Sequence, residues 1–354
     1  MSETDPEYLL TYRKKIAEQF FQMVESAESG SVVGAASMGK TRLIGFVLKP
    51  ETRQHYLGRD ANNTLLMHVD CNRMSEHTEW GLYELMLMTL AETCEVHPEA
   101  GVIVQEYFLK DHKYSTLIKD HNTLSAQRFL ELMVHLLCDK INMKMSFLFD
   151  EFDQTLRDLP AKTFANLRGL RDRHKSKLCF ILFLRGLPKM LRDINEHEFE
   201  GFYELLSKST IGLTPYEIDE CNIIIRELEQ RFHFSLSSSG RSWVLRHCAG
   251  HPGLLQALFH IQRQQTPTDK VQDDSAWIAT RPTVSEECRK IFLGLLQEES
   301  RALLAFERGQ RDQIPPEIYE LLCIKGIISF DPHEMRIFSP VFQSWIRQQT
   351  SPYK

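Results

Sequence analysis

The sequence predicts an α/β protein with a parallel sheet, followed by a helical lid and a C-terminal winged-helix domain. Short, continuous apolar runs alternate with helical patterns up to residue 213, and only helical patterns follow. The chain then ends in helices, a hairpin pattern and one more helix. Continuous apolar runs separated by helices are typical of parallel strands that are buried on both faces.

The predicted sheet strands are runs rich in Val, Ile, Leu, Met and Phe that polar segments bound. They lie at Val32 and Val33 and at residues 64–70, 145–150, 178–184 and 210–213. Between and before them, apolar positions recur with helical spacing at residues 7–28, 79–94, 124–140 and 160–173. Strands and helices that alternate in this way predict a first domain over residues 1–213.

A small helical domain is predicted next, over residues 214–264. Thr214, Pro215 and Glu217 match a capping box that opens a helix ending near Phe232. A second helix, near residues 239–248, closes at Gly250, and a third starts at Pro252. The sharp corner between these two helices follows from the helix-ending glycine and the helix-starting proline.

The remaining chain divides into a connection and a winged-helix domain. Residues 265–284 are polar with two prolines and show no period, so they indicate a connection. Over residues 285–354 we expect a winged-helix domain, with helices followed by a small hairpin around "DPHE" and a last helix opened by Ser339 and Pro340. The expected helices of this domain cover residues 288–297, 300–308 and 316–325.

Composition excludes several classes of protein. The 354 residues are 42% hydrophobic and 25% charged, and no apolar run approaches the roughly 20 residues of a membrane span. The N-terminal "MSETDPEYLLTYRKK" lacks the apolar core of a secretory signal, which predicts a cytoplasmic protein. Eight cysteines without a C-x-x-C pair predict buried free thiols rather than zinc ligands or disulfides. The net charge of −6 gives no general attraction for nucleic acid.

The strongest motif is "GAASMGKT", which satisfies G-x-x-x-x-G-K-[ST] between a strand and a helix. Small residues let successive backbone N–H groups curl around a polyphosphate, and the helix directs its positive end at the same charge. Lys40 is predicted to reach the β and γ phosphates, and the Thr41 hydroxyl to bind Mg²⁺. A random chain of this length matches by chance on the order of once in a hundred. The predicted cofactor-binding loop comprises Gly34, Ala35, Ala36, Ser37, Met38, Gly39, Lys40, Thr41 and Arg42.

A second motif, "FLFDEFD", supplies two carboxylates at the end of an apolar strand. We expect Asp150 to hold Mg²⁺ and Glu151 to polarise a water for attack on the γ phosphate. The alternative is an ordinary solvated strand end. Asp153 is expected to be a helix cap.

Arginines near the same edge are further candidates. Arg185 terminates the strand 178–184 and faces the crevice where open α/β sheets bind ligands, although a surface arginine is the alternative. Arg168, Arg171 and Arg173 include candidates for an arginine acting on a second molecule, but a solvated helix face is the more common meaning of "LRGLRDRHK". None of these three is assigned a role.

Together these segments resemble the ATPases of the AAA+ and STAND group, including origin-recognition-like cores with a lid and a winged helix. The resemblance implies the strand order 5-1-4-3-2 and the choice of ATP and ADP over GTP. It also implies a sensor role for Arg185 and a contact of the nucleotide base with Pro252, in the corner "GHPGLL". His251 by itself is more typical of a cap or a surface residue than of a ligand.

One departure from the resemblance concerns the winged helix. Several signalling relatives carry a Met-His-Asp segment whose histidine holds ADP, whereas "IFSPVF" has Phe338 and Ser339 in the matching places. We therefore expect no ADP latch of that chemistry. Repeat arrays are also absent, since no period of 20 to 50 residues is found.

Three functions remain in competition. The leading hypothesis is a slowly hydrolysing Mg²⁺–ATP switch that changes contact with a protein partner or causes self-association into a homo-oligomer. The second is a DNA-associated loader, but residues 285–354 carry 9 basic and 10 acidic residues, a balance of 9 − 10 = −1. The third is a nucleotide-binding scaffold without turnover.

Overall fold

The computed structural model describes residues 11–110, 113–193, 197–264, 273–329 and 336–350. The chain forms two compact units. One, the sheet unit, comprises Ala17–Val32 and Thr41–Ile211. The other, the lid-and-wing unit, comprises Met1–Ile16, Val33–Lys40 and Gly212–Lys354. The phosphate loop therefore groups with the helical segments that follow the sheet, while the predicted domain boundaries stay predictions.

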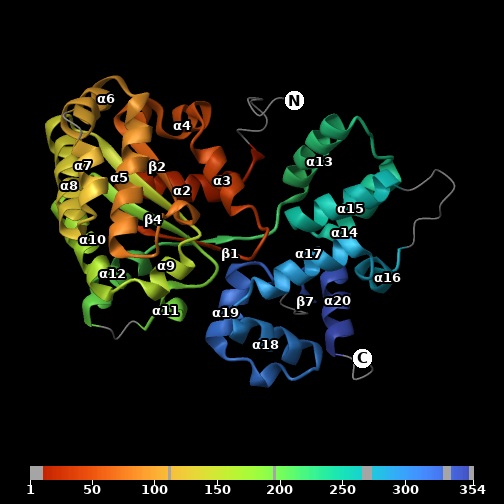
Figure 1. Ribbon diagram of the computed structural model, residues 1–354. Helices are drawn as coiled ribbons and strands as arrows, with labels where there is room; N and C mark the ends of the chain where they lie inside the picture. The colour runs from red at the N-terminus through yellow and green to blue at the C-terminus, as the bar shows by residue number, and fades with distance from the viewer. Residues whose placement is uncertain (1–10, 111–112, 194–196, 265–272, 330–335, 351–354) are drawn as a thin grey trace. The chain divides into compact units, whose positions relative to one another are not determined.

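Five parallel strands form the sheet in the order β2-β3-β4-β1-β5 (Figure 1). Read from its other edge, this order is the expected 5-1-4-3-2. Residue Asp70 at the end of β2 pairs in register with Asp150 at the end of β3. Strand bounds agree with the predicted runs to within one or two residues: β1 Gly30–Gly34, β2 Thr64–Asp70, β3 Lys144–Asp150, β4 Leu178–Leu184 and β5 Thr210–Leu213.

Helices pack around the strands of the sheet unit (Figure 1). The predicted helical segments are confirmed, except that the helix expected over residues 7–28 begins only at Lys14, after a turn in which Arg13 has a φ of 50°. Residues 7–10 lie outside the described residues. The segment 124–140 ends as a π-helical turn. The helical elements are α2 Lys14–Ser26, α3 Lys40–Val47, α4 Pro50–Leu57, η1 Gly58–Asn63, η2 Cys71–Arg73, α5 Glu79–Glu95, α6 Pro98–Val104, η3 Gln105–Leu109, α7 Lys113–Asp120, α8 Thr123–His135, η5 Leu136–Lys140, α9 Asp153–Asp158, α10 Ala161–Arg173, α11 Pro188–Leu191 and α12 His197–Ser207.

An aromatic core anchors the end of β3. Phe149 packs on Phe152 with ring centroids 4.7 Å apart, and Phe152 meets Phe164 at 6.3 Å. Both rings that flank Asp150 and Glu151 in sequence are fully buried. Burying an aromatic side chain stabilises the fold by roughly 2–3 kcal/mol, so this core fixes the backbone that carries the two carboxylates.

Three helices form the lid: α13 Ile218–Phe232, α14 Ser238–Cys248 and α15 Pro252–Gln264. The predicted first capping box is wrong. Helix α13 begins at Ile218, with Glu217 as its N-cap and Glu220 as its partner. Tertiary hydrogen bonds hold the preceding residues outside the helix, since Arg13 donates to the Thr214 carbonyl and Tyr216 N–H donates to the Gly250 carbonyl.

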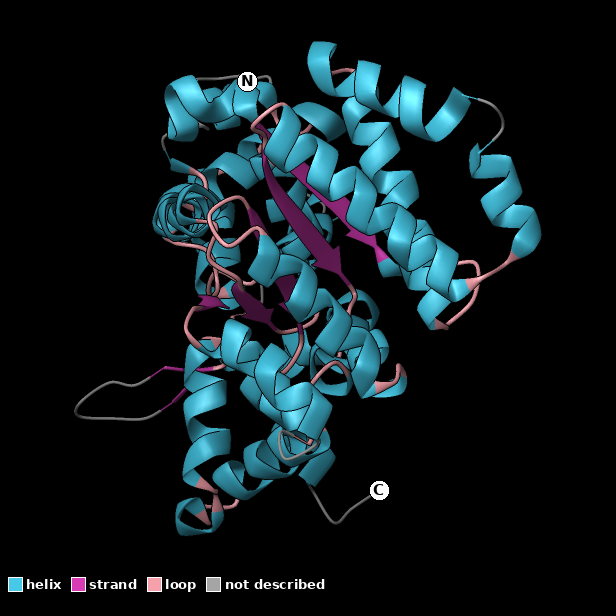
Figure 2. Ribbon diagram, turned by 90° about the vertical axis from the view of Figure 1, so that its left-hand side faces the viewer, coloured by secondary structure: helices cyan, strands magenta, loops and turns pink. Residues whose placement is uncertain are grey.

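The C-terminal part has helices and an antiparallel strand pair, as a winged helix requires (Figure 2). Its elements are α16 Ser275–Ala279, α17 Pro282–Leu293, α18 Gln297–Glu307, η6 Arg311–Gln313, α19 Pro316–Ile324, β6 Ile328–Ser329, β7 Arg336–Ile337 and α20 Pro340–Thr350. The turn "DPHE" lies outside the described residues.

Part of the predicted connection is helical, while its role as a connection stays a prediction. Residues 265–272 lie outside the described residues, but α16 and the start of α17 fall within 265–284. Asp274 caps α16 through the N–H of Ala276, and Pro282 takes the first turn of α17, which therefore starts before the expected Cys288. Within the described ranges, no helix has the length and apolarity needed to cross a bilayer.

Candidate functional site

Nitrogen atoms of three side chains hold four carbonyl groups of the phosphate loop, which runs from the end of β1 into α3. Lys40 Nζ donates to the carbonyl oxygens of Gly34 and Ala35, at 3.1 and 3.3 Å. Arg13 donates to Met38 O at 2.9 Å. His251 Nε2 lies 3.3 Å from Ala36 O. All of these residues belong to the lid-and-wing unit.

This anchoring fixes the direction of backbone N–H groups. In a trans peptide the C=O and the following N–H point in opposite directions. The bonds to Ala36 O and Met38 O therefore turn the N–H groups of Ser37 and Gly39 away from His251 and Arg13. Positive φ angles of 56° at Ser37 and 91° at Gly39 produce the required curl. Such a curled backbone is an anion cradle.

Arg13 is a site residue that the sequence analysis missed. Its guanidinium lies 4.1 Å above the ring of Tyr216 and donates to the carbonyls of Met38 and Thr214. Its backbone N–H donates to Glu220. In "TYRKK" an arginine resembles the solvated face of an amphipathic helix. Arg13 is instead only 3% exposed, and its hydrogen bonds join the N-terminal segment to the loop and the lid.

A cavity of about 270 Å³ adjoins Arg13. Among the described residues, no acceptor reaches the buried Nε of Arg13. The predicted lid contact Pro252 is buried at the first position of α15, and Gly250 before it has a φ of 82°. The cavity is lined by Thr11, Arg13, Lys14, Lys15, Ile16, Thr214, Pro215, Glu217, Asp219 and Glu220.

Thr41 and Asp150, the two predicted Mg²⁺ ligands, come together in the sheet unit. Thr41 Oγ1 donates to Asp150 Oδ2 at 3.2 Å. His68 Nε2, from β2, is 3.5 Å from the same oxygen, and Asp150 is 3% exposed. Burial opposes ionisation of Asp150, but the nearby His68 ring and the hydrogen bonds from Thr41 and the Glu151 N–H outweigh it and lower its pKa. The sequence analysis missed His68, because the pattern of residues in β2 gives no sign of a contact with Asp150.

Glu151 and Arg185 are also brought together. Arg185 Nη2 donates to Glu151 Oε2 at 2.8 Å, and Glu151 has a φ of 50°. The backbone N–H of Arg185 donates to Asp153 Oδ1 at 2.8 Å. The expectation that Asp153 caps a helix is wrong: α9 begins at Asp153, with Phe152 as its N-cap. Its carboxylate ties α9 to the end of β4 instead. Arg42 lies half-buried on α3.

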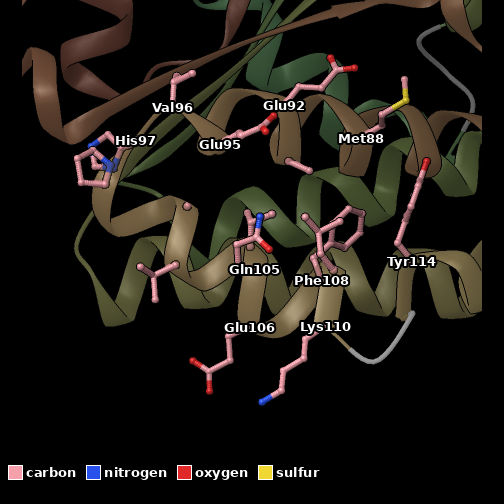
Figure 3. Close-up of a pocket in the computed structure, with 16 residues that line it drawn as sticks. Met88, Glu92, Glu95, Val96, His97, Gln105, Glu106, Phe108, Lys110 and Tyr114 are labelled. Carbon is pink, nitrogen blue, oxygen red and sulfur yellow. The ribbon is translucent and has the colours of Figure 1, made fainter.

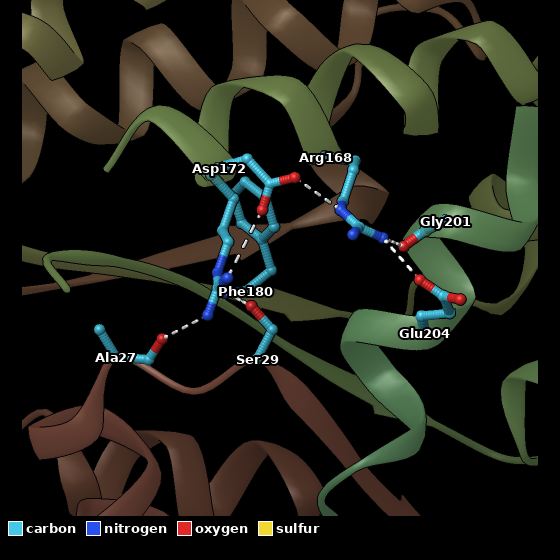
Figure 4. A network of polar contacts seen from close by, with 8 residues as sticks. Ala27, Ser29, Arg168, Asp172, Phe180, Gly201 and Glu204 are labelled. Carbon is cyan, nitrogen blue, oxygen red and sulfur yellow. Dashed lines mark hydrogen bonds and ion pairs between the residues drawn. The ribbon is translucent and has the colours of Figure 1, made fainter. Parts of the chain in front are cut away.

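The arginines of α10 bind neighbouring elements (Figure 4). Arg168 pairs with Asp172 at 2.8 Å and with Glu204 of α12 at 3.3 Å, and it donates to the Gly201 carbonyl. Arg171 donates to the Ala27 carbonyl at 3.3 Å, just before β1. A solvated face is therefore the wrong interpretation for these two. It fits Arg173, whose side chain is 63% exposed.

A separate cavity of about 790 Å³ opens between α5 and the segment Pro98–Leu109 (Figure 3). Met88 of α5 and Phe108 both line it, while Glu106 and Lys110 point away. None of the predicted site residues lines this cavity. Its position among the helices after β2 separates it from the chemistry described above.

Two solved structures share the whole architecture. A Walker-type ATPase of Pyrococcus abyssi has a TM-score of 0.56 and 15% identity, over 97% of this chain and 97% of that chain. The chain has the P-loop NTPase fold. The ORC2 protein of Aeropyrum pernix, solved as ADPNP–ADP complexes, has a TM-score of 0.51 and 12% identity, over 98% of this chain and 97% of that chain.

No protein-family model matches this chain, and neither does any curated protein sequence. The predicted AAA+ resemblance, sheet order, lid and winged helix are confirmed as features of the fold. Its STAND part stays a prediction.

Proposed function

We propose that this AAA+ chain binds Mg²⁺–ATP on the phosphate loop, hydrolyses it slowly, and thereby changes its contact with a protein partner or a second copy. The observation that carries the proposal is the loop itself. Its carbonyls are held by Lys40, Arg13 and His251, so that backbone N–H groups are left to bind an anion.

Phosphate binding draws on three features of the loop. Lys40 contributes a positive charge that is 7% exposed, and it opens helix α3. The Ser37 and Gly39 N–H groups contribute neutral donors, and the start of α3 adds the positive end of a helix dipole. In our proposal Lys40 leaves the Gly34 and Ala35 carbonyls for the phosphate oxygens, which are the stronger acceptors.

The cavity beside Arg13 is the proposed position of the nucleotide base. It adjoins the loop through the Arg13–Met38 hydrogen bond, and its residue Pro215 leads to Tyr216, which is bonded to Gly250 in the corner before Pro252. The Nε–H of Arg13, which no acceptor among the described residues reaches, is a donor suited to a ring nitrogen of a purine. The preference for ATP over GTP rests on the AAA+ resemblance.

Thr41 and Asp150 fit a magnesium ion. Both present oxygen atoms, which Mg²⁺ prefers, and the lowered pKa keeps Asp150 ionised. Among the described residues no group of three or more His, Cys, Asp or Glu is placed to hold a metal. Mg²⁺ at nucleotide sites commonly takes one or two protein ligands and completes its shell with phosphate and water. When bound, it would neutralise charge on the phosphates.

Glu151 and Arg185 are the proposed catalytic pair. Arg185 now occupies a carboxylate oxygen of Glu151. A γ phosphate offers Arg185 a stronger, multiply charged acceptor, so its arrival frees Glu151 to accept a proton from the attacking water.

Titration calorimetry with ATP and ADP tests the proposal. Replacing Lys40 by Ala removes a charge-assisted contact, and we expect affinity to fall about 10- to 100-fold. Lys162→Ala is the control, because the Lys162 side chain is 62% exposed and its Nζ lies 3.6 Å from Glu198 Oε1. Absence of nucleotide heat in folded wild-type protein would refute the proposal. Size-exclusion chromatography with ADP and with a non-hydrolysable ATP analogue then tests self-association.

A nucleotide-binding scaffold without turnover is the second candidate, because the Arg185–Glu151 pair also describes a site held inactive. A DNA-associated role lacks support from charge, since the winged-helix segment has a balance of 9 − 10 = −1. A salt-sensitive mobility shift with duplex DNA would reverse that judgement.

A further inference from the structure

His251 is fully buried at the corner between α14 and α15, and its two ring nitrogens have different partners. Nδ1 accepts the Leu254 N–H at 3.3 Å, which places the ring proton on Nε2. Nε2 therefore donates to the Ala36 carbonyl at 3.3 Å. Burial lowers the pKa of His251 to about 4, so the ring is neutral. The imidazole is a single-proton link between the lid and the phosphate loop.

The winged helix contacts both ends of this link. The ring of Phe338, which follows β7, lies 5.7 Å from the His251 ring. At the end of α17, Gly294 approaches the loop so closely that an added Cβ would lie 2.4 Å from Ala36 Cβ. All of these residues belong to the lid-and-wing unit. The winged helix therefore meets the imidazole through Phe338 and the loop through Gly294.

The position of Phe338 depends on the hairpin and the last helix. Its backbone N–H donates to Ile327 O at 2.9 Å, and its ring packs against Phe342 at 5.6 Å. The next residue, Ser339, donates to the His247 carbonyl at 2.9 Å and caps α20 through the Phe342 N–H at 3.2 Å. A displacement of the imidazole must therefore shift Phe338 together with the start of α20, because close-packed side chains transmit displacement.

The phosphate loop depends on the same imidazole. The Ala36 carbonyl and the Ser37 N–H belong to one planar peptide, so the Nε2–H bond sets the direction of the Ser37 N–H. A phosphate oxygen that accepts a hydrogen bond from the Ser37 N–H therefore exerts a force on the same peptide that His251 holds. Without the donor at His251, this peptide is free to rotate and the cradle loses one of its fixed groups.

We propose that His251 is a positioning residue that couples nucleotide binding on the phosphate loop to the winged helix. It holds the Ala36–Ser37 peptide for the phosphates, and its ring carries the state of the loop to Phe338. This inference rests on the proposed nucleotide binding. It assigns to the lid corner a role in regulation beyond contact with the base.

Two substitutions at His251 separate its donor from its bulk. We expect His251→Leu to bind fluorescent ADP and ATP analogues about tenfold more weakly, the value of one lost hydrogen bond of about 1.4 kcal/mol. Glutamine keeps an N–H donor, so His251→Gln is expected to retain affinity to within about threefold. Rescue by Gln but not by Leu distinguishes positioning from simple packing. His77→Leu, at an exposed histidine of the sheet unit, is the control.

The coupling itself is measured by hydrogen exchange of the α20 backbone amides, with and without ADP. Wild-type protein is expected to show nucleotide-dependent protection there, and His251→Leu to lose it. Phe338→Leu keeps the His251–Ala36 bond but removes the ring contact, so we expect affinity within about twofold of wild type and loss of the protection.

The possible failures are distinguishable. If wild-type protein binds no nucleotide, the proposed function fails. If wild type binds but His251→Leu keeps both affinity and protection, the coupling alone is overturned. Should His251→Leu not fold, as judged by circular dichroism, the other two variants decide: Phe338→Leu with wild-type protection overturns the coupling, and so does His251→Gln with the affinity loss expected of Leu.

Discussion

Arg185 Nη2 lies 2.8 Å from Glu151 Oε2, so the proposed sensor cation is paired with the proposed catalytic carboxylate. The two side chains are 42% and 33% exposed, which leaves the pair within reach of solvent and ligand. An exposed ion pair contributes little stability, typically about 0–1 kcal/mol, so a phosphate can replace it at small cost. We therefore propose that the pair detects the γ phosphate.

Replacing Arg185 by Ala should therefore distinguish ATP from ADP. We expect affinity for a non-hydrolysable ATP analogue to fall about tenfold, while affinity for ADP changes by less than about twofold, since only ATP offers a γ phosphate. Calorimetry with both nucleotides measures the difference. Arg173→Ala is the control, because Arg173 is 63% exposed and pairs with Glu131. An equal loss for ADP and ATP would remove the sensor role.

Glu151→Gln should uncouple binding from turnover. The amide keeps the size of the side chain but cannot accept a proton from water, so phosphate release is expected to fall about 100-fold or more. ATP binding should persist, because Glu151 is not among the residues proposed to hold phosphate or magnesium. Phosphate-release assays under single-turnover conditions measure the effect. Equal release by the variant and the parent would favour the scaffold.

Asp150→Asn should abolish the magnesium dependence of ATP binding. In wild-type protein we expect EDTA to weaken ATP affinity about tenfold, and in the variant EDTA should have almost no effect, because one of two oxygen ligands has lost its charge. Calorimetry with and without Mg²⁺ provides the measurement. Asp158→Asn, at an exposed carboxylate of α9, is the matched control. A full EDTA response in Asp150→Asn would place the ion elsewhere.

The depressed pKa of His251 predicts a stability that depends on pH. Unfolded histidine titrates near 6.5, whereas burial and the nearby Arg13 charge hold the folded pKa at about 4. Between these values the unfolded state binds more protons, so the free energy of unfolding falls as pH decreases through this window, by about 2 kcal/mol from pH 7 to pH 5.

Urea unfolding of wild type and His251→Gln at both pH values tests this. Other titrating groups are common to the two proteins, so the variant should lose the His251 share of the slope. Identical slopes would show that His251 is not held neutral in the folded state.

Local sequence predicted most of the fold because its signals are local. Strand β4 is an uninterrupted apolar run, and the phosphate-binding motif consists of eight adjacent residues, so both can be recognised from neighbouring positions alone. The missed features depend on partners far away in sequence. Arg13 forms hydrogen bonds with Met38 and Glu220. The start of α13 is shifted because Arg13 donates to the Thr214 carbonyl and the Tyr216 N–H donates to the Gly250 carbonyl. Helical periodicity carries no information about such tertiary bonds.

Lys325 and Glu299 form an ion pair inside the winged helix, with both side chains fully buried and Nζ–O distances of 2.6 and 2.7 Å. Glu299 also accepts the Leu296 N–H in the capping box of α18. Lys325→Met leaves a buried carboxylate without its cation, and we expect the free energy of unfolding to fall by about 3–5 kcal/mol. Urea unfolding followed by circular dichroism measures it.

The double variant Lys325→Met/Glu299→Gln provides the decisive comparison. It removes both charges, so most of the lost stability should return, because the penalty arises from an unpaired charge and not from the missing attraction. Lys290→Ala serves as the control, since its side chain is 55% exposed and lies 3.9 Å from Glu287. If the double variant is as unstable as Lys325→Met, then packing around Lys325, and not charge balance, determines the stability of this domain.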